Sequence, residues 1–120
     1  MAGQMVHLEI PAADTAKARA FWGSLFGWEF EGFEGSPAEY HMARIDDSSG
    51  SAIYEADGDK RGTRVYFDVD DIRAGIARVA ELGGEAGDAM PVPSMGWFAI
   101  CRDTEGNEFG LWQTDPSASM

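Results

Sequence analysis

Alternating hydrophobic and polar residues divide the first half of the chain into strands and one helix. Val6–Ile10 alternates apolar side chains with His7 and Glu9, which is typical of a half-buried strand that Pro11 ends. Residues 14–26 carry apolar side chains at helical spacing, with Asp14 as N-cap and Gly27 as left-handed C-cap. The predicted stripe of this helix is Ala18, Phe21, Trp22 and Leu25. Three further strands are predicted at Trp28–Phe33, Glu39–Ile45 and Ser51–Glu55, with a Gly35–Pro37 turn after the first of these.

The second half shows the same succession. Arg64–Val69 alternates like a strand, and Asp70 or Asp71 caps a helix whose apolar stripe is Ile72, Ile76, Val79 and Leu82. Glu85–Pro93 is predicted as an irregular edge strand because its prolines cannot donate hydrogen bonds to a sheet. Gly96–Gln113 reads as a hairpin in which Gly106 and Asn107 adopt positive φ. Asp115–Met120 is expected to be a frayed tail.

The two halves align at an offset of 57 residues. Leu8 falls on Val65, Asp14 on Asp71 and Tyr40 on Trp97 in this alignment, so strands, caps and turns coincide. We therefore predict an α+β fold of two paired βαβββ modules, forming a curved mixed sheet around a shared cleft. Module 1 covers about residues 5–56 and module 2 about residues 63–113, joined by the polar linker Ala56–Gly62 within one domain, 1–120.

Period-two geometry predicts which side chains line the cleft. If the apolar residues of both first strands face the helices, the polar residues face the other way. The predicted cleft face contains His7, Glu9, Arg64, Tyr66 and Asp68, extended by Ile53, Glu55, Gly110 and Trp112.

Composition and charge narrow the classes of function. The chain has 120 residues and a net charge of −12, which opposes binding to nucleic acid or to an anionic membrane. A single cysteine, Cys101, excludes an internal disulfide and is expected to be inert core. The N-terminal sequence predicts no signal peptide, and no segment has membrane-spanning length. We expect a cytoplasmic protein.

Four segments resemble the glyoxalase/bleomycin-resistance/dioxygenase family, the vicinal oxygen chelate superfamily. They are His7 followed by LEI, Asp14 with Phe21-Trp22 running into LFGW, YFDVDD at residues 66–71, and RDTEGNEFGLWQ at residues 102–113. The chain looks closest to the branch described as "predicted enzyme related to lactoylglutathione lyase". The resemblance implies paired βαβββ modules around a cleft, in agreement with the fold predicted from the pattern.

The resemblance also implies a divalent metal site, with one ligand from the first and last strand of each module. The corresponding positions are His7, Ile53, Arg64 and Gly110, of which only His7 can ligate a metal. We therefore expect neither the usual metal site nor another cofactor. The alternative is an oxygen-rich site built from His7, Glu9 and Glu55.

Other candidate residues have two interpretations each. His7 and Glu9 form either a general acid/base pair, with the carboxylate raising the imidazole pKa, or a hydrogen-bonded polar pair. Arg64 either clamps a carboxylate or phosphate, or pairs with Glu9, Glu55 or Asp68. Aromatic side chains either stack on a flat ligand or pack in a core or dimer interface: Tyr66, Trp97 and Trp112. His41 is treated as a surface or satisfied histidine.

The leading functional hypothesis is a small-molecule-binding protein without the usual metal, using His7 and Glu9 as catalytic residues. Its ligand-binding residues would be Glu55, Arg64, Tyr66, Asp68 and Trp112. The alternative is a divalent-metal-dependent lyase, isomerase or dioxygenase using His7, Glu9 and Glu55, and a third class is a structural dimer without a ligand. A homodimer is expected because four Trp and seven Phe occur in only 120 residues.

Overall fold

A computed structural model describes residues 2–34, 38–56 and 62–120 of the chain. The chain divides into two compact units, which we describe separately. The first unit is His7–Arg64, and the second combines the residues up to Val6 with Val65–Met120. No helix in the described parts of the chain is long and apolar enough to cross a membrane.

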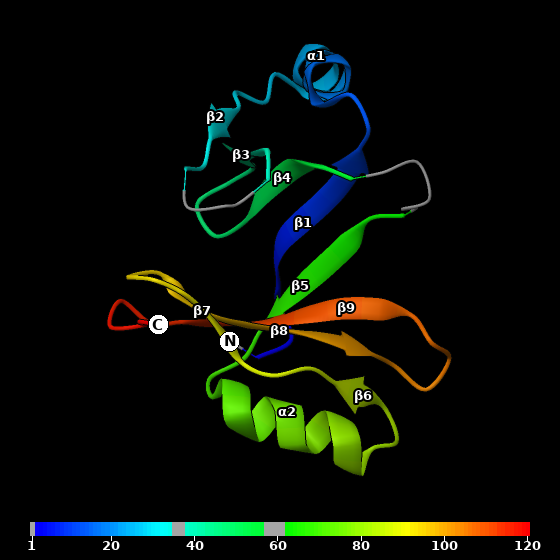
Figure 1. Cartoon of the computed structure of the whole chain (residues 1–120), viewed down its shortest axis with the longest axis vertical. Helices are drawn as coiled ribbons and strands as arrows, with labels where there is room; N and C mark the ends of the chain where they lie inside the picture. Colours follow the sequence, from blue (N-terminus) through cyan, green and yellow to red (C-terminus); the bar gives the residue numbers. More distant parts are fainter. Residues whose placement is uncertain (1, 35–37, 57–61) are drawn as a thin grey trace. The chain divides into compact units, whose positions relative to one another are not determined.

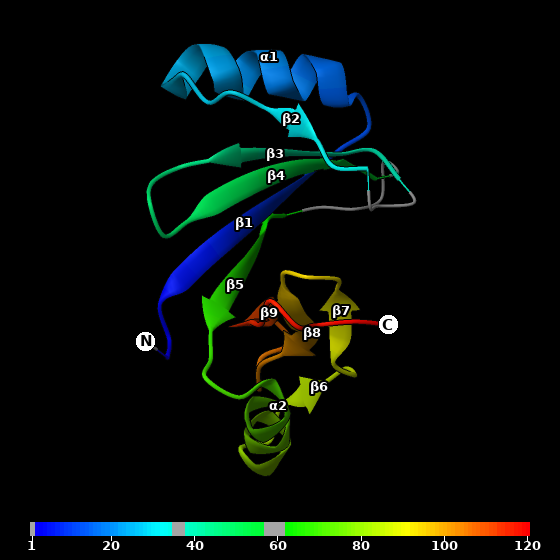
Figure 2. The same cartoon turned by 90° about the vertical axis from the view of Figure 1, so that its left-hand side faces the viewer.

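The first unit is a mixed sheet with one helix (Figures 1 and 2). Its elements are β1 (Met5–Ala12), α1 (Thr15–Phe26), β2 (Glu31–Gly32), β3 (Tyr40–Arg44) and β4 (Gly50–Glu55). Strand β4 pairs in parallel with β1 and antiparallel with β3, and β3 pairs antiparallel with β2. Helix α1 packs against β4, where Ile53 is fully buried together with Ala43 and Ile10.

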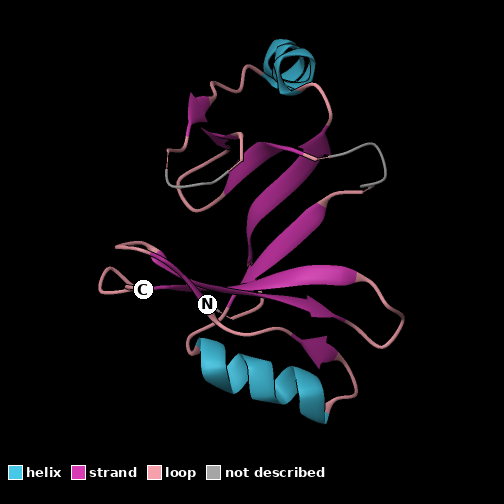
Figure 3. Ribbon diagram, in the orientation of Figure 1, coloured by secondary structure: helices cyan, strands magenta, loops and turns pink. Residues whose placement is uncertain are grey.

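The second unit follows this order with one further strand (Figure 3). Its elements are β5 (Arg64–Asp68), α2 (Ile72–Glu81), β6 (Glu85–Ala86), β7 (Met90–Val92), β8 (Gly96–Arg102) and β9 (Glu108–Thr114). Strand β9 pairs in parallel with β5 and antiparallel with β8, while β6 and β7 both pair with β8. The α+β class, the two modules and the Gly96–Gln113 hairpin are confirmed, with the predicted Glu85–Pro93 strand divided into β6 and β7. The single domain and the shared cleft stay predictions.

Helix ends follow the sequence signals. The Asp14 side chain accepts a hydrogen bond from the Lys17 backbone N–H, and Asp71 accepts from Arg73 and Ala74. Gly27 has a φ of 75°, and its N–H donates to the Gly23 carbonyl at 2.8 Å. A left-handed residue at this position satisfies an orphan carbonyl of the last helical turn, so α1 ends where predicted.

The core of the second unit lies between α2 and the hairpin. Ile72, Ala99, Cys101 and Leu111 are buried there. Burial raises the pKa of the Cys101 thiol, which suits the predicted role as inert core. The Gly106 turn residue has positive φ as predicted, but Asn107 does not; its backbone and side chain instead donate to the Asp103 carboxylate.

Three predictions for the first unit, two element boundaries and one buried stripe, are wrong. Strand β1 continues through Pro11 to Ala12. The missing N–H of Pro11 does not end the strand, because only alternate N–H groups of a strand face one neighbour. The strand expected at Trp28–Phe33 is reduced to Glu31–Gly32, since Trp28 stacks on Trp22 of α1 at 5.6 Å instead of pairing in the sheet. In the predicted α1 stripe, Phe21 and Leu25 are exposed rather than buried.

The C-terminal segment is not the frayed tail that its composition predicted. The Asp115 N–H donates to the Met95 carbonyl at 2.9 Å, and the Ser94 N–H donates to the Ala118 carbonyl at 2.9 Å. Ala118 is buried, and the Asp115 carboxylate accepts a hydrogen bond from the Trp97 indole. These bonds fasten the segment to the turn between β7 and β8. The predicted Gly35–Pro37 turn and most of the Ala56–Gly62 linker lie outside the described residues.

Tyr66 occupies the space that a side chain at position 110 would need. It is only 5% exposed, and its ring contacts Phe98 and lies directly over Gly110. A Cβ atom at position 110 would fall far inside contact distance of the Tyr66 ring. Gly110 is therefore required by close packing within the second unit.

We expect Gly110→Ala to destabilise the protein by about 1–3 kcal/mol, because overpacking a filled site forces side chains off their preferred rotamers. Urea denaturation measures the change. Gly32→Ala is the matched control, since its Cβ meets nothing closer than the His41 ring at 3.9 Å, and a change within about 0.5 kcal/mol is expected. Equal stabilities of the two variants would contradict the proposed packing.

Candidate functional site

Four side chains of the first unit form one continuous hydrogen-bonded chain, which we call the His7 network. His7 Nε2 lies 2.8 Å from the Tyr40 hydroxyl. The Tyr40 hydroxyl donates to Glu9 Oε2 at 2.7 Å, and Arg64 Nη1 donates to Glu9 Oε1 at 2.7 Å. The predicted residues His7, Glu9 and Arg64 are therefore brought together, through a tyrosine that the sequence analysis did not select.

Strand register explains why Tyr40 reaches His7 and Glu9. On β4, Gly50 lies beside His7 and Ala52 beside Glu9, so β4 presents small side chains next to these two residues. Residues in register share a face, and Tyr40 on β3 pairs with Tyr54, which pairs with Pro11 of β1. The Tyr40 ring can therefore extend over β4 to β1. Small residues at positions 50 and 52 are the sequence signal that would have indicated this contact.

Glu9 and Arg64 form a largely buried ion pair. Their side chains are 11% and 16% exposed, and the charged atoms are 2.7 Å apart. A buried charge without a partner is strongly destabilising, so each residue requires the other. Glu9, one of the partners predicted for Arg64, is therefore confirmed.

His7 is poised as a neutral base. Burial lowers the pKa of its imidazole, and the negative charge of Glu9 opposes this only in part. The carboxylate therefore raises the pKa as predicted, but desolvation outweighs it and the net shift is downward. Since Tyr40 donates its only hydroxyl proton to Glu9, its oxygen accepts from His7 Nε2–H. The lone pair of neutral His7 is then on Nδ1, the nitrogen next to Gly50.

Glu55 does not belong to this face of the sheet. It is paired with Ala12, and Ile53 is paired with Ile10, so both project opposite to His7 and Glu9. Glu55 is exposed, and Ile53 is fully buried beneath α1. The predicted face was wrong by one residue on β4, which reverses every side chain of the strand.

The candidates in the second unit share a face of their own. Tyr66 is paired with Gly110 and Asp68 with Trp112, so all four lie on one side of the sheet, as predicted. The Trp112 indole donates to the Thr114 hydroxyl at 3.0 Å. Tyr66 is buried against Phe98, which favours its packing interpretation. That these side chains bind the same ligand as the His7 network stays a prediction.

The donors present do not fit the divalent metal that the family resemblance implies. Arg64 is a cation paired with Glu9, Ile53 faces the core, and position 110 is covered by Tyr66. Within residues 2–34, 38–56 and 62–120, no group of three or more His, Cys, Asp or Glu side chains converges. His7, Glu9 and Glu55 in particular are split between two faces. We therefore assign no metal-dependent chemical step to this chain.

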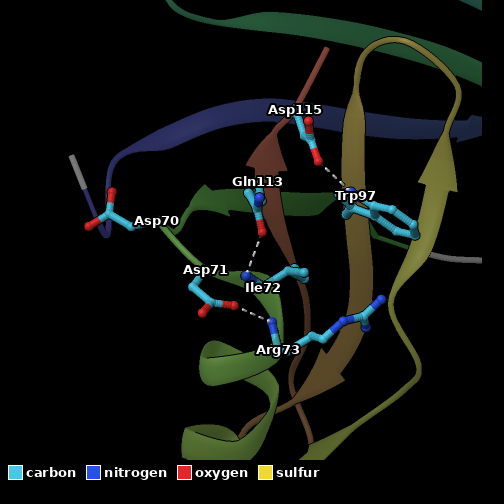
Figure 4. Close-up of a pocket in the computed structure, with 7 residues that line it drawn as sticks. All are labelled: Asp70, Asp71, Ile72, Arg73, Trp97, Gln113 and Asp115. Carbon is cyan, nitrogen blue, oxygen red and sulfur yellow. Dashed lines mark hydrogen bonds between the residues drawn. The ribbon is translucent and has the colours of Figure 1, made fainter. Parts of the chain in front are cut away.

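A hollow of about 420 Å³ lies at the start of α2 in the second unit (Figure 4). Several of its polar groups are engaged with one another: Gln113 accepts from the Ile72 N–H, and Trp97 donates to Asp115. The Arg73 guanidinium lies 5.4 Å from the centre of the Trp97 ring. The Ser117 hydroxyl and the Trp97 indole lower the pKa of Asp115. These contacts join α2 to β8, β9 and the C-terminal segment.

His41 is a satisfied histidine, as one interpretation predicted. Its Nε2 lies 2.8 Å from Glu39 Oε1, which also accepts a hydrogen bond from the Thr15 hydroxyl at 2.7 Å. The His41 contact lowers the pKa of Glu39. His41 is paired with Ile53 and so lies on the face opposite to the His7 network.

The lowered pKa of His7 gives a testable dependence of stability on pH. Between the folded-state pKa and the ordinary value of 6.5, the unfolded chain binds more protons than the folded protein. The free energy of unfolding is therefore not reduced by His7 above about pH 6.5, and it falls as the pH decreases toward the folded-state pKa. His7→Gln removes this contribution while retaining a side-chain N–H that can donate to Tyr40. We expect the free energy of unfolding, measured in urea at pH 5.5 and 7.5, to change less in the variant.

All other titratable groups are common to both proteins, so their contributions cancel in this comparison. An NMR titration of His7 provides a second check, because Glu9→Gln should lower its pKa further by removing the carboxylate charge. Identical pH dependence in wild type and His7→Gln would show that burial does not control this imidazole.

Comparison with known proteins agrees with the fold. The sequence profile of the glyoxalase-like domain matches residues 5–112. A glyoxylase-like domain-containing protein of Didymella fabae is 30% identical, over 91% of this chain and 92% of that protein. The putative glyoxylase CFP32 of Mycobacterium bovis is 28% identical over 90% of this chain. The match covers only 44% of the length of CFP32.

Among solved structures, a methylmalonyl-CoA epimerase in complex with methylmalonyl-CoA and NH4+ is similar with a TM-score of 0.77. The alignment covers 100% of both chains at 17% sequence identity, a level at which the likeness shows a shared fold. The resemblance carried by the four sequence segments is thereby confirmed. The chain belongs to the glyoxalase-like domain family, within the vicinal oxygen chelate superfamily.

Proposed function

We propose that the protein binds a small organic ligand at the His7 network and moves a proton on it by acid–base chemistry, without a divalent metal. The observation that carries this proposal is the hydrogen-bonded chain from His7 through Tyr40 to Glu9 and Arg64. A neutral imidazole held by such a chain is the arrangement that general-base catalysis requires.

Each member of the network has a distinct role in this proposal. His7 Nδ1 accepts a proton from the ligand, which leaves an imidazolium whose Nε2–H remains bonded to Tyr40. The Tyr40 hydroxyl transmits the charge of Glu9 to that imidazolium, and Arg64 compensates Glu9 in the resting state. Tyr40 and Glu9 are positioning residues, whereas His7 is the catalytic residue that contacts the ligand.

The proposed ligand class follows from these roles. A proton that neutral His7 can remove is one on a carbon next to a carbonyl group, because the electron pair of the broken C–H bond then passes into the carbonyl as an enolate. The guanidinium of Arg64 has five N–H groups, and an anionic or electron-rich ligand oxygen near it is the feature that we expect it to recognise. The complex of the similar epimerase contains methylmalonyl-CoA, so acyl thioesters are the first compounds to test.

The rival hypotheses are less well supported. A metal-dependent lyase, isomerase or dioxygenase using His7, Glu9 and Glu55 would need the three side chains on one face, but Glu55 is in register with Ala12 on the other. A structural dimer without a ligand gives no reason for placing a buried ion pair beside a neutral imidazole.

Homodimer formation is part of our proposal. Cytoplasmic localisation and the lack of a nucleic-acid partner stay predictions from sequence.

Proton exchange in D₂O tests the chemistry directly. With methylmalonyl-CoA and other 2-substituted acyl thioesters in the presence of EDTA, we expect wild type to accelerate exchange of the acidic C–H, measured by ¹H NMR. His7→Gln should lower the rate at least about 100-fold, a typical contribution of one general base. Tyr40→Phe should lower it less and shift its pH profile, because the imidazole loses its orienting partner.

His41→Gln is the matched control, since it removes the other histidine, on the opposite face, and should leave exchange unchanged. Native mass spectrometry of the purified protein would reveal a ligand of another class. Stoichiometric metal that survives dialysis and is lost in His7→Ala would overturn the metal-free proposal.

Arg64→Met tests ligand recognition. This variant keeps much of the stem volume and removes the guanidinium, so we expect ligand binding to weaken by roughly 1.5–3 kcal/mol through loss of a charge-assisted hydrogen bond. Because the variant leaves Glu9 without its ion-pair partner, Arg64→Met/Glu9→Gln serves as the folding control. Isothermal titration calorimetry gives the affinities, and unchanged binding in a folded variant would show that Arg64 is structural only.

A further inference from the structure

Helix α1 presents an apolar face that is exposed among the described residues of the first unit. Phe21, Leu25 and Phe26 are 61%, 56% and 57% exposed. In α2, by contrast, Ile72 is buried, Ile76 and Val79 are half-buried, and only Leu82 at the C-cap is similarly exposed. We call the three exposed side chains of α1 the α1 face.

The α1 face is backed by a continuous cluster of aromatic rings. Phe21 contacts Trp22 edge-on at 5.5 Å, and Trp22 stacks on Trp28 at 5.6 Å with the rings 10° apart. Phe26 lies 5.4 Å from Trp28. Packed rings have few rotatable bonds, so a surface of this kind loses little conformational entropy when it is covered.

The internal repeat shows that these rings are not needed to build the unit. At the offset of 57 residues, Phe21 corresponds to Arg78, Phe26 to Gly83, Trp28 to Glu85 and Phe30 to Gly87. The second unit forms the same succession of elements with polar residues or glycine at these positions. The aromatic residues of the first unit are therefore an addition to a shared architecture, and the addition is at the surface.

Charge identifies the occupant of this surface. The chain carries 21 acidic and 9 basic residues, yet the only charged residues of α1 are Lys17 and Arg19. The segment after the helix is acidic, with Glu29, Glu31 and Glu34. A basic helix followed by an acidic segment is complementary to its own copy turned end for end, as a two-fold axis requires.

We propose that the α1 face is a homodimer interface, in which two α1 helices pack antiparallel across a two-fold axis. This inference rests on the homodimer of the proposed function and names its surface. The three exposed side chains present on the order of 300 Å², the size of the largest apolar patch of a typical monomer, which is often a functional surface. Lys17 of one chain then lies toward Glu29 of the other, at the polar rim of the interface.

Substitutions on the two helices test the proposal with a matched control. Sedimentation equilibrium of wild type at micromolar concentration should give twice the monomer mass of 13.0 kDa. Leu25→Glu on α1 should weaken the dimer at least about 100-fold. Leu82→Glu should leave it unchanged, although Leu82 is equally exposed at the equivalent position of α2.

A charge exchange tests the orientation of the helices. Lys17→Glu should weaken the dimer, and the double variant Lys17→Glu/Glu29→Lys should restore most of the lost affinity. Far-UV circular dichroism confirms that each variant is folded. Failure of the double variant to restore the affinity would overturn the antiparallel arrangement.

The outcomes separate this inference from the proposed function. A dimer that persists in Leu25→Glu would overturn the α1 face as the interface but leave the homodimer intact. A monomeric wild type would overturn both, and binding of that monomer to anionic liposomes through Leu25 would assign the face to a membrane surface. Because His7→Gln should remain dimeric, failure of the acid–base chemistry would not affect this result.

Discussion

Glu9 and Arg64 are both withdrawn from water, so the structure can hold neither charge without the other. This pair fixes the orientation of the Glu9 carboxylate, which leaves its second oxygen directed at Tyr40. Tyr40 in turn determines which nitrogen of His7 carries the proton. The ion pair of Glu9 with Arg64 thereby sets the tautomer of His7 through Tyr40.

The sequence pattern indicated three of the four residues of the His7 network but not Tyr40. His7, Glu9 and Arg64 were found because alternation in a strand places polar residues on one face. Tyr40 was missed because its contact with Glu9 spans 31 residues and depends on the register of β3 with β4. Glu55 was predicted on the wrong face because the assumed register of β4 with β1 was wrong by one residue, which reverses a strand with a side-chain period of two.

The errors in the fold predictions have a common physical cause. At Trp28 and in the C-terminal segment, local patterns were overridden by specific contacts that hydrophobic periodicity does not report. Trp28 stacks on a helical tryptophan, and Ala118 is buried by bonds to the turn at Ser94. The hairpin and the helix caps were predictable because their determinants lie within a few residues of each other.

The packing of Tyr66 over Gly110 also constrains how this chain can change during evolution. A metal-ligating side chain at position 110 cannot be accommodated while Tyr66 occupies the space above it, and replacing Tyr66 first would open a void over a glycine. Either single step lowers stability, so the two positions are epistatic. A lineage with this pair is therefore separated from metal-binding relatives by a stability barrier, and selection would act more readily on the residues around His7.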